Sequence, residues 1–484
     1  MSYMNYGEIQ WKICCGTSLE KIERKALSVL YGAVAGYVPY VLSVCHPGEE
    51  TANDNLIYFG TAKSNPALTP LEKKGVYRPN REPEGYSINV APSLRCAERT
   101  DIVIQGADPS GVLYGVYSFI TAYLDDIWKY EGYHFNRRAE LFRDPAPRFA
   151  LSESPSVKNR GIWTWGHRIY DYRTFLENMA RCKMNMLIMW NDFAPVNGKE
   201  IVEYAHDCGI RVIWGFSCGW GDDVEVDPLD DGNMEKWCRK VLDTYETEYL
   251  PLGGDGLYFQ GFTERNETSI NGVSIASLIT RWINTVAGKL HRKFPELYIQ
   301  FGLHATSIRE NFGELGALSG DATPVWEDCG SFPYHYDPRE GNIPETFEYH
   351  KKIIELAEKN GKFGAVFKGF TVLNWKTFEH YRGRTLIGES DELFRRERLE
   401  EKRFYWKFCE PYWINNAPIL REFCRAVENA KLSESTVVAL VEDGMFEDAV
   451  SPSVGLFAEL IWNAKTDPQK LIERVYHSEH YRIG

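Results

Sequence analysis

From residue 160 onward, the chain repeats one pattern of apolar and polar positions. Short apolar runs rich in β-branched and aromatic residues alternate with longer stretches in which apolar residues recur every three or four positions. Runs of the first kind are typical of strands in a parallel sheet, and stretches of the second kind are typical of amphipathic helices. We predict strands at residues 160–165, 186–190, 210–216, 256–262, 297–303, 323–328, 363–370 and 435–442.

Helical stretches fill most of the gaps between these strands. We predict helices at residues 171–182, 199–208, 234–249, 272–293, 343–360 and 452–463, with a long helical insertion near 391–430. A series of eight strands that alternate with helices is what a (β/α)8 TIM barrel requires. We therefore assign residues 160–484 to a barrel, which we expect to be the catalytic domain.

The first part of the chain follows a different order. "NLIYFGTAKSN" (55–65) predicts a buried strand and a turn, "YSINVAP" (86–92) alternates, and residues 100–124 predict a strand, a turn and a helix. We assign residues 1–145 to a mixed α/β accessory domain. Pro, Ser and charged residues then gather before the barrel, so we expect residues 146–159 to be a linker or an edge segment at the domain boundary.

Composition and charge narrow the partners. The chain has 484 residues, 44% of them hydrophobic, and a net charge of −13. A strongly acidic chain is a poor partner for nucleic acid or for an anionic membrane surface, so we expect neither. No apolar run is long enough to span a bilayer, and the first residues lack the apolar core of a secretion signal. The oligomeric state stays open, and a homo-oligomer is one of the states allowed.

Eleven cysteines are scattered without CxxC pairs. This usage fits reduced thiols in a cytoplasmic protein better than a disulfide framework. The neighbours Cys14 and Cys15 lie in a predicted strand, so we expect them to point to opposite faces and to pair with nothing. The segment "HSEH" (477–480) offers two histidines without a third ligand, and we predict no metal and no cofactor.

In a TIM barrel, the active site lies at the carboxyl ends of the strands. The residues at these ends are unusually rich in Trp, with His, Asn, Lys and acidic residues among them. Aromatic faces stack on sugar rings while polar side chains bind hydroxyl groups, so this composition favours a carbohydrate substrate over a structural role for all the tryptophans. The candidate substrate-binding residues are Trp165, His167, Trp190, Asn191, Asp192, Trp214, His304, Trp326, Lys368 and Trp375.

Cleavage of a glycosidic bond needs two carboxyl groups, one as acid and one as base or nucleophile. Glu264 follows the apolar strand 256–262, and we expect apolar surroundings to keep it protonated as the general acid. A solvated surface Glu is the alternative. The second carboxyl is Glu327 or Asp328, which stand at the end of the predicted strand 323–328 and point in opposite directions. Asp192 is a third candidate, although it could equally cap a turn or a helix.

Several segments resemble known glycosidases. "YFGTAKSNPAL", "GYSINV" and "DIVIQGADPSGVLYGVYSFI" resemble the accessory domain that precedes the barrel in α-glucuronidases of glycoside hydrolase family 67, and family 20 β-hexosaminidases carry a similar domain. "SPSVGLFAELIWNAKTDPQKLIERV" looks like the last helix of the α-glucuronidase barrel. The resemblance implies a glycosidase with its catalytic Glu after the fourth strand, at Glu264.

The chain departs from both families. After the seventh strand it has Lys368 where the resemblance implies a carboxylate, and after the fourth it has Thr263–Glu264 rather than the Asp–Glu pair of family 20. We therefore expect an inverting glycosidase with its base after the sixth strand. A retaining or substrate-assisted hexosaminidase-like enzyme, or an inactive glycan-binding barrel, remain alternatives. For a uronic acid substrate, Lys368, Arg382 and Arg384 are the candidate cations.

Overall fold

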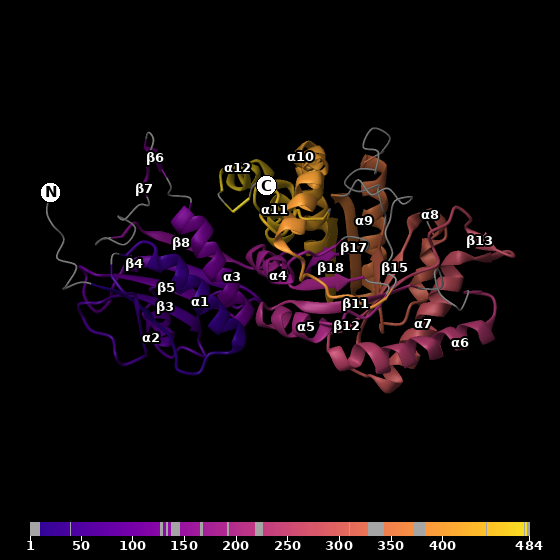
Figure 1. Ribbon diagram of the computed structural model, residues 1–484, viewed down its shortest axis with the longest axis horizontal. Helices are drawn as coiled ribbons and strands as arrows, with labels where there is room; N and C mark the ends of the chain where they lie inside the picture. Colours follow the sequence, from indigo (N-terminus) through magenta and orange to yellow (C-terminus); the bar gives the residue numbers. More distant parts are fainter. Residues whose placement is uncertain are drawn as a thin grey trace. The chain divides into compact units, whose positions relative to one another are not determined.

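The computed structural model describes residues 10–38, 40–125, 129–131, 134–136, 146–164, 168–190, 193–217, 226–308, 310–327, 343–370, 383–441, 443–478 and 480–481. The chain divides into two compact units, whose main segments meet between Pro155 and Ser156. Strands and helices carry the labels of Figure 1, in which the first unit is indigo to purple.

The first unit is built on a six-stranded mixed sheet. Its strand order is β2-β1-β3-β5-β4-β8, and all neighbours are parallel except that β4 runs antiparallel to both β5 and β8. The strands are β1 (Trp11–Cys14), β2 (Ser43–Cys45), β3 (Asn55–Thr61), β4 (Tyr86–Pro92), β5 (Thr100–Gly106) and β8 (Phe149–Glu153), and a separate hairpin joins β6 (Lys129–Glu131) to β7 (His134–Asn136). The expected mixed α/β fold is confirmed.

Helices cover this sheet, so its central strands are buried on both faces. The helices are α1 (Lys21–Ala35), α2 (Leu68–Lys73) and α3 (Pro109–Phe119), which continues into the π-helical turn η1 (Ile120–Asp125). Helix α3 packs against β3, β4, β5 and α1 (Figure 1). Helix α2 contributes Leu68 and Leu71 to a core that also contains Leu56 and Tyr58 of β3.

The segment expected to be a linker has structure of its own. Strand β8 lies within residues 146–159 and pairs with β4 from Tyr86↔Glu153 to Val90↔Phe149, so it is an edge strand of the first sheet. Its alternating burial is the pattern of a strand with one covered face. The Pro-rich composition around β8 is compatible with a linker and with an edge segment, and the pairing with β4 decides for the edge segment.

The second unit is a closed barrel of eight parallel strands, in the order β10-β11-β12-β15-β16-β17-β18-β9. This confirms the predicted TIM barrel, and each strand lies within about two residues of its expected bounds. The strands are β9 (Asn159–Trp163), β10 (Met186–Met189), β11 (Arg211–Ser217), β12 (Gly256–Gln260), β15 (Tyr298–Leu303), β16 (Thr323–Trp326), β17 (Lys362–Phe370) and β18 (Glu434–Val441).

The barrel helices match the amphipathic stretches of the sequence. They are α4 (Tyr172–Arg181), α5 (Gly198–Asp207), α6 (Asp231–Thr244), α7 (Ile275–Lys293), α9 (Ile343–Asn360), α10 (Glu392–Asn429), α11 (Pro452–Trp462) and α12 (Pro468–His477). Shorter elements are η3 (Tyr245–Tyr249), η4 (Leu250–Leu252), the hairpin of β13 (Ser269–Ile270) and β14 (Val273–Ser274), α8 (Ala305–Ile308) and η5 (Phe312–Ala317). The long helix α10 is orange in Figure 1.

Side chains fill the barrel interior. The core cluster consists of Trp163, Met186, Ile188, Trp190, Ile213, Tyr258, Val325, Val366, Val438 and Leu440. Because successive side chains of a strand point to opposite faces, this list fixes which residues of these strands face inward. The interior is therefore a packed core. Catalysis needs polar side chains, and these can be expected at the carboxyl ends of the strands.

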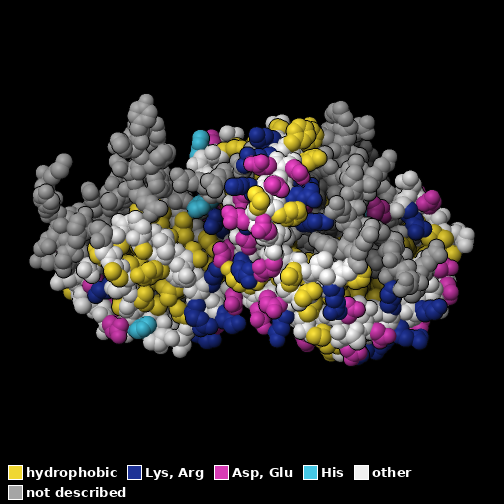
Figure 2. Space-filling view, in the orientation of Figure 1, with side chains coloured by type: hydrophobic (Ala, Val, Ile, Leu, Met, Phe, Trp, Pro, Cys, Tyr) yellow, Lys and Arg dark blue, Asp and Glu magenta, His cyan; other side chains and the backbone are white. Residues whose placement is uncertain are grey.

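Among the described residues on the face shown in Figure 2, Lys and Arg side chains are interspersed with Asp and Glu along the barrel helices. Among the residues described, no helix is both long and apolar enough to cross a membrane.

Candidate active site

A buried carboxylate lies at the carboxyl end of the barrel interior. Glu327 follows β16 and its side chain is fully buried. Its Oε1 accepts a hydrogen bond of 2.5 Å from the Tyr258 hydroxyl, and its Oε2 accepts one of 3.2 Å from Gln260 Nε2. Lys368 Nζ lies 3.4 Å from the same Oε2. Three strands, β12, β16 and β17, thus converge on one carboxylate.

A glycine makes room for this carboxylate. A Cβ atom at Gly302, on β15, would lie 1.8 Å from Glu327 Oε1 and 2.5 Å from the Tyr258 hydroxyl oxygen. Both distances are far below van der Waals contact, so any other residue at this position would displace Glu327 or Tyr258. The close approach of the Glu327 carboxylate to the neighbouring strand therefore depends on a residue without a side chain.

The surroundings of Glu327 push its pKa in two directions. Burial raises the pKa of the Glu327 carboxyl above its ordinary value, and the nearby charge of Glu264 adds to this. The Lys368 ammonium group and the Tyr258 hydroxyl act against it, and the net pKa is raised. Glu327 is thus a carboxyl that takes up a proton more readily than an exposed one, beside a cation that stabilises its ionised form.

His304 follows β15 and lies between two carboxylates. Its Nε2 is 3.5 Å from Glu327 Oε2 and 4.0 Å from Glu264 Oε2. Thr263 Oγ1 accepts a hydrogen bond of 2.9 Å from the His304 backbone N–H and lies 3.2 Å from Nδ1, and Ser307 Oγ in turn donates to the Thr263 carbonyl oxygen at 2.6 Å. The ring is therefore fixed from behind with Nε2 turned toward the carboxylates.

The imidazole of His304 is held neutral. Burial, followed by the charge of Lys368, lowers the pKa of His304 well below its ordinary value. A Thr263 hydroxyl that donates to Nδ1 leaves the ring proton on Nε2, where it faces both carboxylates. Nε2 has no hydrogen-bond partner among the described residues, and the same holds for Gln260 Oε1. Two buried polar atoms around Glu327 are thus available to a water molecule or to a substrate hydroxyl.

Glu264 is the accessible carboxylate of the group. Its side chain is 56% exposed, compared with 5% for His304 and 0% for Glu327. The Glu264 and Glu327 oxygens lie within about 7.5 Å of one another, because both distances end on His304 Nε2. This limit is compatible with the roughly 5 to 5.5 Å between carboxyl groups of retaining glycosidases and with the lower part of the roughly 6.5 to 9.5 Å of inverting ones.

The structure corrects the expected surroundings of Glu264. Apolar residues of β12 are buried as expected, but the chain turns after Gly261 and carries the Glu264 side chain into solvent. The desolvated carboxyl is Glu327 instead. Sequence position at a strand end therefore located both acids, while the burial of each depends on contacts with neighbouring strands.

Two of the predicted tryptophans lie away from the barrel interior. Ile213 faces inward, so its neighbour Trp214 faces the helix layer, where its Nε1 donates to the Gly253 carbonyl oxygen at 2.9 Å and its ring packs on Tyr249. Likewise Val325 faces inward and the buried Trp326 faces outward. The structure thus corrects the expectation that these two residues contact a substrate.

Trp190 is the predicted aromatic residue that the structure brings to the site. It belongs to the interior cluster and its ring meets Tyr258 edge-on, with 6.4 Å between ring centroids. Lys368, expected to meet a sugar carboxylate, is 3% exposed and lies 4.9 Å from the centre of the Trp163 ring. The register between β17 and β18 shifts between Phe367 and Phe370, where irregular pairing re-aims a side chain. Lys368 therefore serves Glu327, whereas Arg384 pairs with Glu248 at 3.0 Å.

Other candidates lie outside the described residues. These are Trp165, His167, Asn191, Asp192, Asp328, Trp375 and Arg382.

Sequence reasoning missed three residues of the site. The sequence suggests that Tyr258 and Gln260 are part of a uniformly buried strand, and that Trp163 is barrel packing. One signal could have found Gln260, because an amide in the middle of an apolar strand must have a buried partner. Once Gln260 faces inward, alternation places Tyr258 inward as well.

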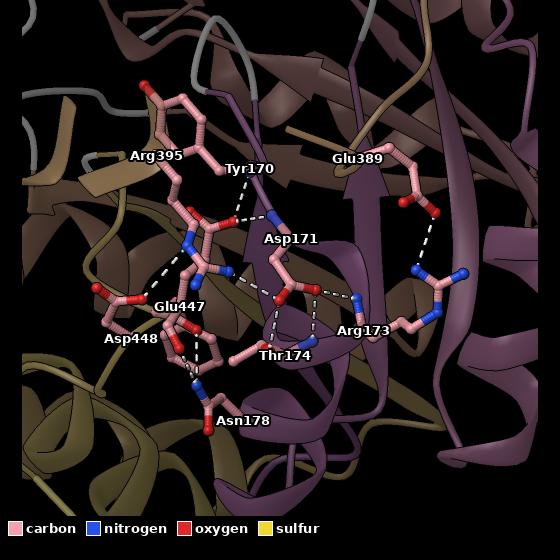
Figure 3. Close-up of polar contacts among 10 residues, drawn as sticks. Tyr170, Asp171, Arg173, Thr174, Asn178, Glu389, Arg395, Glu447 and Asp448 are labelled. Atoms are coloured by element: carbon pink, nitrogen blue, oxygen red, sulfur yellow. Dashed lines mark hydrogen bonds and ion pairs between the residues drawn. The ribbon is translucent and has the colours of Figure 1, made fainter. Parts of the chain in front are cut away.

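A second polar cluster supports the same end of the barrel (Figure 3). Glu447, in the loop after β18, is 1% exposed, and its Oε1 accepts the backbone N–H groups of Tyr170 and Asp171 at 2.5 and 2.6 Å. Asn178 Nδ2 donates to the Glu447 carbonyl oxygen at 3.0 Å. The loops after β9 and β18 are therefore joined through one buried side chain.

Charged residues surround this junction. Arg395, near the start of α10, lies 2.9 Å from Asp171 Oδ2 and 3.5 Å from Asp448 Oδ1 (Figure 3). Asp171 also caps α4 by accepting the backbone N–H groups of Arg173 and Thr174. Burial raises the pKa of Glu447 to about 8, although the two backbone donors lower it. We regard this cluster as support for the loops, since Glu447 Oε1 and Asp171 accept backbone N–H groups and Arg395 pairs with Asp171 and Asp448.

No group of three or more His, Cys, Asp or Glu side chains within the described ranges is arranged to hold a metal ion.

No protein-family model matches the chain, and no curated protein is similar to it in sequence. Solved structures share its fold. The chain is similar to CpGH84B with a TM-score of 0.54 and 13% identity, over 96% of this chain and 70% of that one. It is also similar to a GH138 enzyme targeting pectin rhamnogalacturonan II, with a TM-score of 0.52 and 12% identity, over 96% of this chain and about half (52%) of that one. At these identities the comparisons show the fold alone, a TIM barrel shared with glycoside hydrolases.

Proposed function

We propose that this protein is a glycoside hydrolase with Glu264 as general acid and Glu327 as general base. The observation that carries the proposal is the pair of carboxylates from β12 and β16 that face one neutral imidazole, within about 7.5 Å of one another. Glycoside cleavage requires two carboxyl groups roughly 5 to 9.5 Å apart, and this upper limit is compatible with that requirement. The fold shared with glycoside hydrolases supports it.

Each residue of the group then has a task. Glu264 is the carboxyl that reaches solvent, so it can meet the oxygen of the leaving group and protonate it. Glu327, ionised beside Lys368, accepts a proton from the attacking water, and its raised pKa makes it a stronger base. His304 Nε2 and Gln260 Oε1 bind and orient that water or a sugar hydroxyl.

We propose inversion as the outcome. A base whose oxygens are already held by Tyr258 and Gln260 is suited to accept a proton from water and poorly suited to attack a sugar carbon. The alternative is retention, through Glu327 as nucleophile or through a substrate-assisted step. Proton NMR of the first-formed anomer distinguishes the two outcomes directly, since an inverting enzyme releases the opposite anomer.

A specific observation favours a second candidate function, glycan binding without turnover. Glu327 is fully buried and both of its oxygens have donors, as expected of a carboxylate whose role is to hold Lys368 and His304 in place. In that case Glu264 and His304 would bind sugar hydroxyls, and the second catalytic carboxyl would be missing.

One experiment separates these candidates. Wild type, Glu264→Gln and Glu267→Gln are assayed on short oligosaccharides and aryl glycosides that include uronic acid and N-acetylhexosamine members. Glu267 is an exposed control three residues from Glu264. Hydrolysis of one member that falls by orders of magnitude only in Glu264→Gln supports the acid role. Saturable binding of a glycan without hydrolysis would establish the second candidate, and hydrolysis unaffected by Glu264→Gln would place the acid elsewhere.

A further inference from the structure

Two cysteines lie side by side in the sheet of the first unit. Strand β2 pairs with β1 in parallel register, and Cys14 is the partner of Cys45. Directly paired residues of neighbouring strands project to the same face, and the strands lie about 4.8 Å apart. This spacing falls within the range of roughly 4.4 to 6.8 Å between Cα atoms that a disulfide requires. The backbone therefore already has the geometry of a cross-strand cysteine pair.

The two cysteines belong to one buried core. Cys14 is fully buried and Cys45 is 6% exposed, and both belong to the cluster that also contains Tyr58 and Leu71. Cys14, Cys15 and Cys45 are all free thiols, so the expectation that Cys14 and Cys15 form no disulfide is confirmed. The thiols of Cys14 and Cys45 nevertheless influence one another, because the interaction between them lowers the pKa of Cys45 and raises the pKa of Cys14.

A turn brings a carboxylate onto the pair. After Cys45 the chain reverses through Pro47 and Gly48, where Gly48 has a φ of 97° that favours glycine. The Gly48 N–H donates to Glu50 Oε2 at 2.6 Å, and Glu50 Oε1 accepts a hydrogen bond of 3.5 Å from Cys14 Sγ. Glu50 therefore spans the turn and the thiol pair.

This carboxylate also lines a cavity that opens on the surface of the first unit. The cavity has a volume of about 380 Å³, and its wall includes Glu50, Tyr58, Leu71 and Leu94. A small molecule in the cavity would thus lie beside the residue that contacts Cys14. Cys182 and Cys424, by contrast, are buried cysteines whose thiol pKa values are raised chiefly by burial, without a contribution from a second thiol.

We propose that Cys14 and Cys45 form a redox-active dithiol that is oxidised to an intrachain disulfide by small-molecule disulfides entering from the Glu50 cavity. The site is a modification site of the first unit and is independent of the proposed hydrolase function. Its product ties the edge strand β2, and the turn that follows it, to β1.

The reaction is thiol–disulfide exchange in two steps. The Cys45 thiolate attacks one sulfur of the external disulfide, forms a mixed disulfide and releases one thiolate. The Cys14 thiol transfers its proton to Glu50, and its sulfur attacks the Cys45 sulfur and releases the second thiolate. The cysteine pair loses two electrons, and the external disulfide gains them and leaves as two thiolates. One released thiolate takes up the proton that Glu50 received from Cys14, and the other takes up from water the proton that Cys45 lost on ionising.

The test uses the folded wild-type chain and oxidised glutathione as the probe. After incubation, free thiols are blocked by alkylation, and non-reduced peptides are mapped by mass spectrometry. The expected result is a cross-linked species that joins the peptides of Cys14 and Cys45 and disappears on reduction. Cys15→Ala is the matched control, because Cys15 neighbours Cys14 in sequence and burial raises its pKa to about 11. Cross-linking should persist in Cys15→Ala and be lost in Cys45→Ser.

Two results would overturn the proposal. One is a folded wild type in which Cys14 and Cys45 stay alkylatable as free thiols after oxidation. The other is cross-linking that appears only in denaturant, together with random pairings, which would show that the native contact does not promote it. A third measurement tests Glu50: Glu50→Gln should slow formation of the disulfide several-fold without abolishing it, and an unchanged rate would remove Glu50 from the mechanism.

Discussion

The buried carboxyl of Glu447 predicts an unusual dependence of stability on pH. Its pKa is raised from 4.5 to about 8 by burial. A group whose pKa is higher in the folded than in the unfolded state stabilises the fold below the unfolded value and loses that contribution as pH rises through the folded one. The window therefore runs from pH 4.5 to about 8. The difference of roughly 3.5 pH units corresponds to a loss of about 5 kcal/mol once Glu447 is ionised.

The substitution Glu447→Gln isolates this effect. The Gln side chain keeps an oxygen that can accept the backbone N–H groups of Tyr170 and Asp171, and it cannot ionise. We expect the variant to match wild type near pH 5 and to exceed it by about 3 to 5 kcal/mol near pH 9. Urea unfolding followed by Trp fluorescence at several pH values measures the difference. Amide exchange at Tyr170 and Asp171 reports on the junction itself.

The neighbouring residue Asp448 provides a control for the effect of Glu447→Gln on stability. Asp448→Asn alters a neighbouring carboxylate that is 47% exposed, so its effect should be small and nearly independent of pH. If Glu447→Gln is destabilised by the same amount at every pH, the carboxyl is ionised throughout and the reasoning about its burial is wrong.

Two further predictions concern Glu327. Lys368→Met removes the charge that lowers the pKa of Glu327. The acid limb of the pH profile of kcat/KM should therefore move up by at least about 1 pH unit. A limb that does not move would mean that Glu327 is not the base. Gly302→Ala places a Cβ atom 1.8 Å from Glu327 Oε1. We expect a loss of about 1 to 3 kcal/mol in the free energy of unfolding, together with a large fall in kcat. An unchanged melting temperature and an unchanged kcat would show that Glu327 tolerates displacement.

Much of the fold was predictable because its signals are local. Each barrel strand is buried on both faces, so it appears in the sequence as an apolar run. Such a run can be recognised without knowing which strands lie beside it. Helix α1 was not predicted, although Ala26, Leu30 and Val34 recur at four-residue spacing behind a capping box of Glu20 and Glu23. For the stretch that contains β8 the sequence leaves a linker and an edge segment both open, because the pairing of β8 with β4 is not visible in the composition of β8.

The site was predictable in outline and not in detail. Glu264, His304 and Glu327 are candidates from the sequence because barrel chemistry gathers at strand ends, and the structure brings these three side chains together. Which side chains face the barrel interior depends on the register of each strand. Trp214 and Trp326 were expected at the site, but their neighbours Ile213 and Val325 face inward instead. The burial of Glu327 depends on Gly302 of the adjacent strand, a contact that no single segment reveals.

The measurement that tests the central claim most directly is the dependence of Glu264→Gln hydrolysis on the leaving group. A variant without its general acid should lose orders of magnitude in kcat/KM on alkyl glycosides, whose leaving group needs a proton, and far less on dinitrophenyl glycosides, whose leaving group does not. This unequal loss is the result that the account predicts. An equal loss on both substrates, or no loss on either, would contradict the role of Glu264 as the general acid.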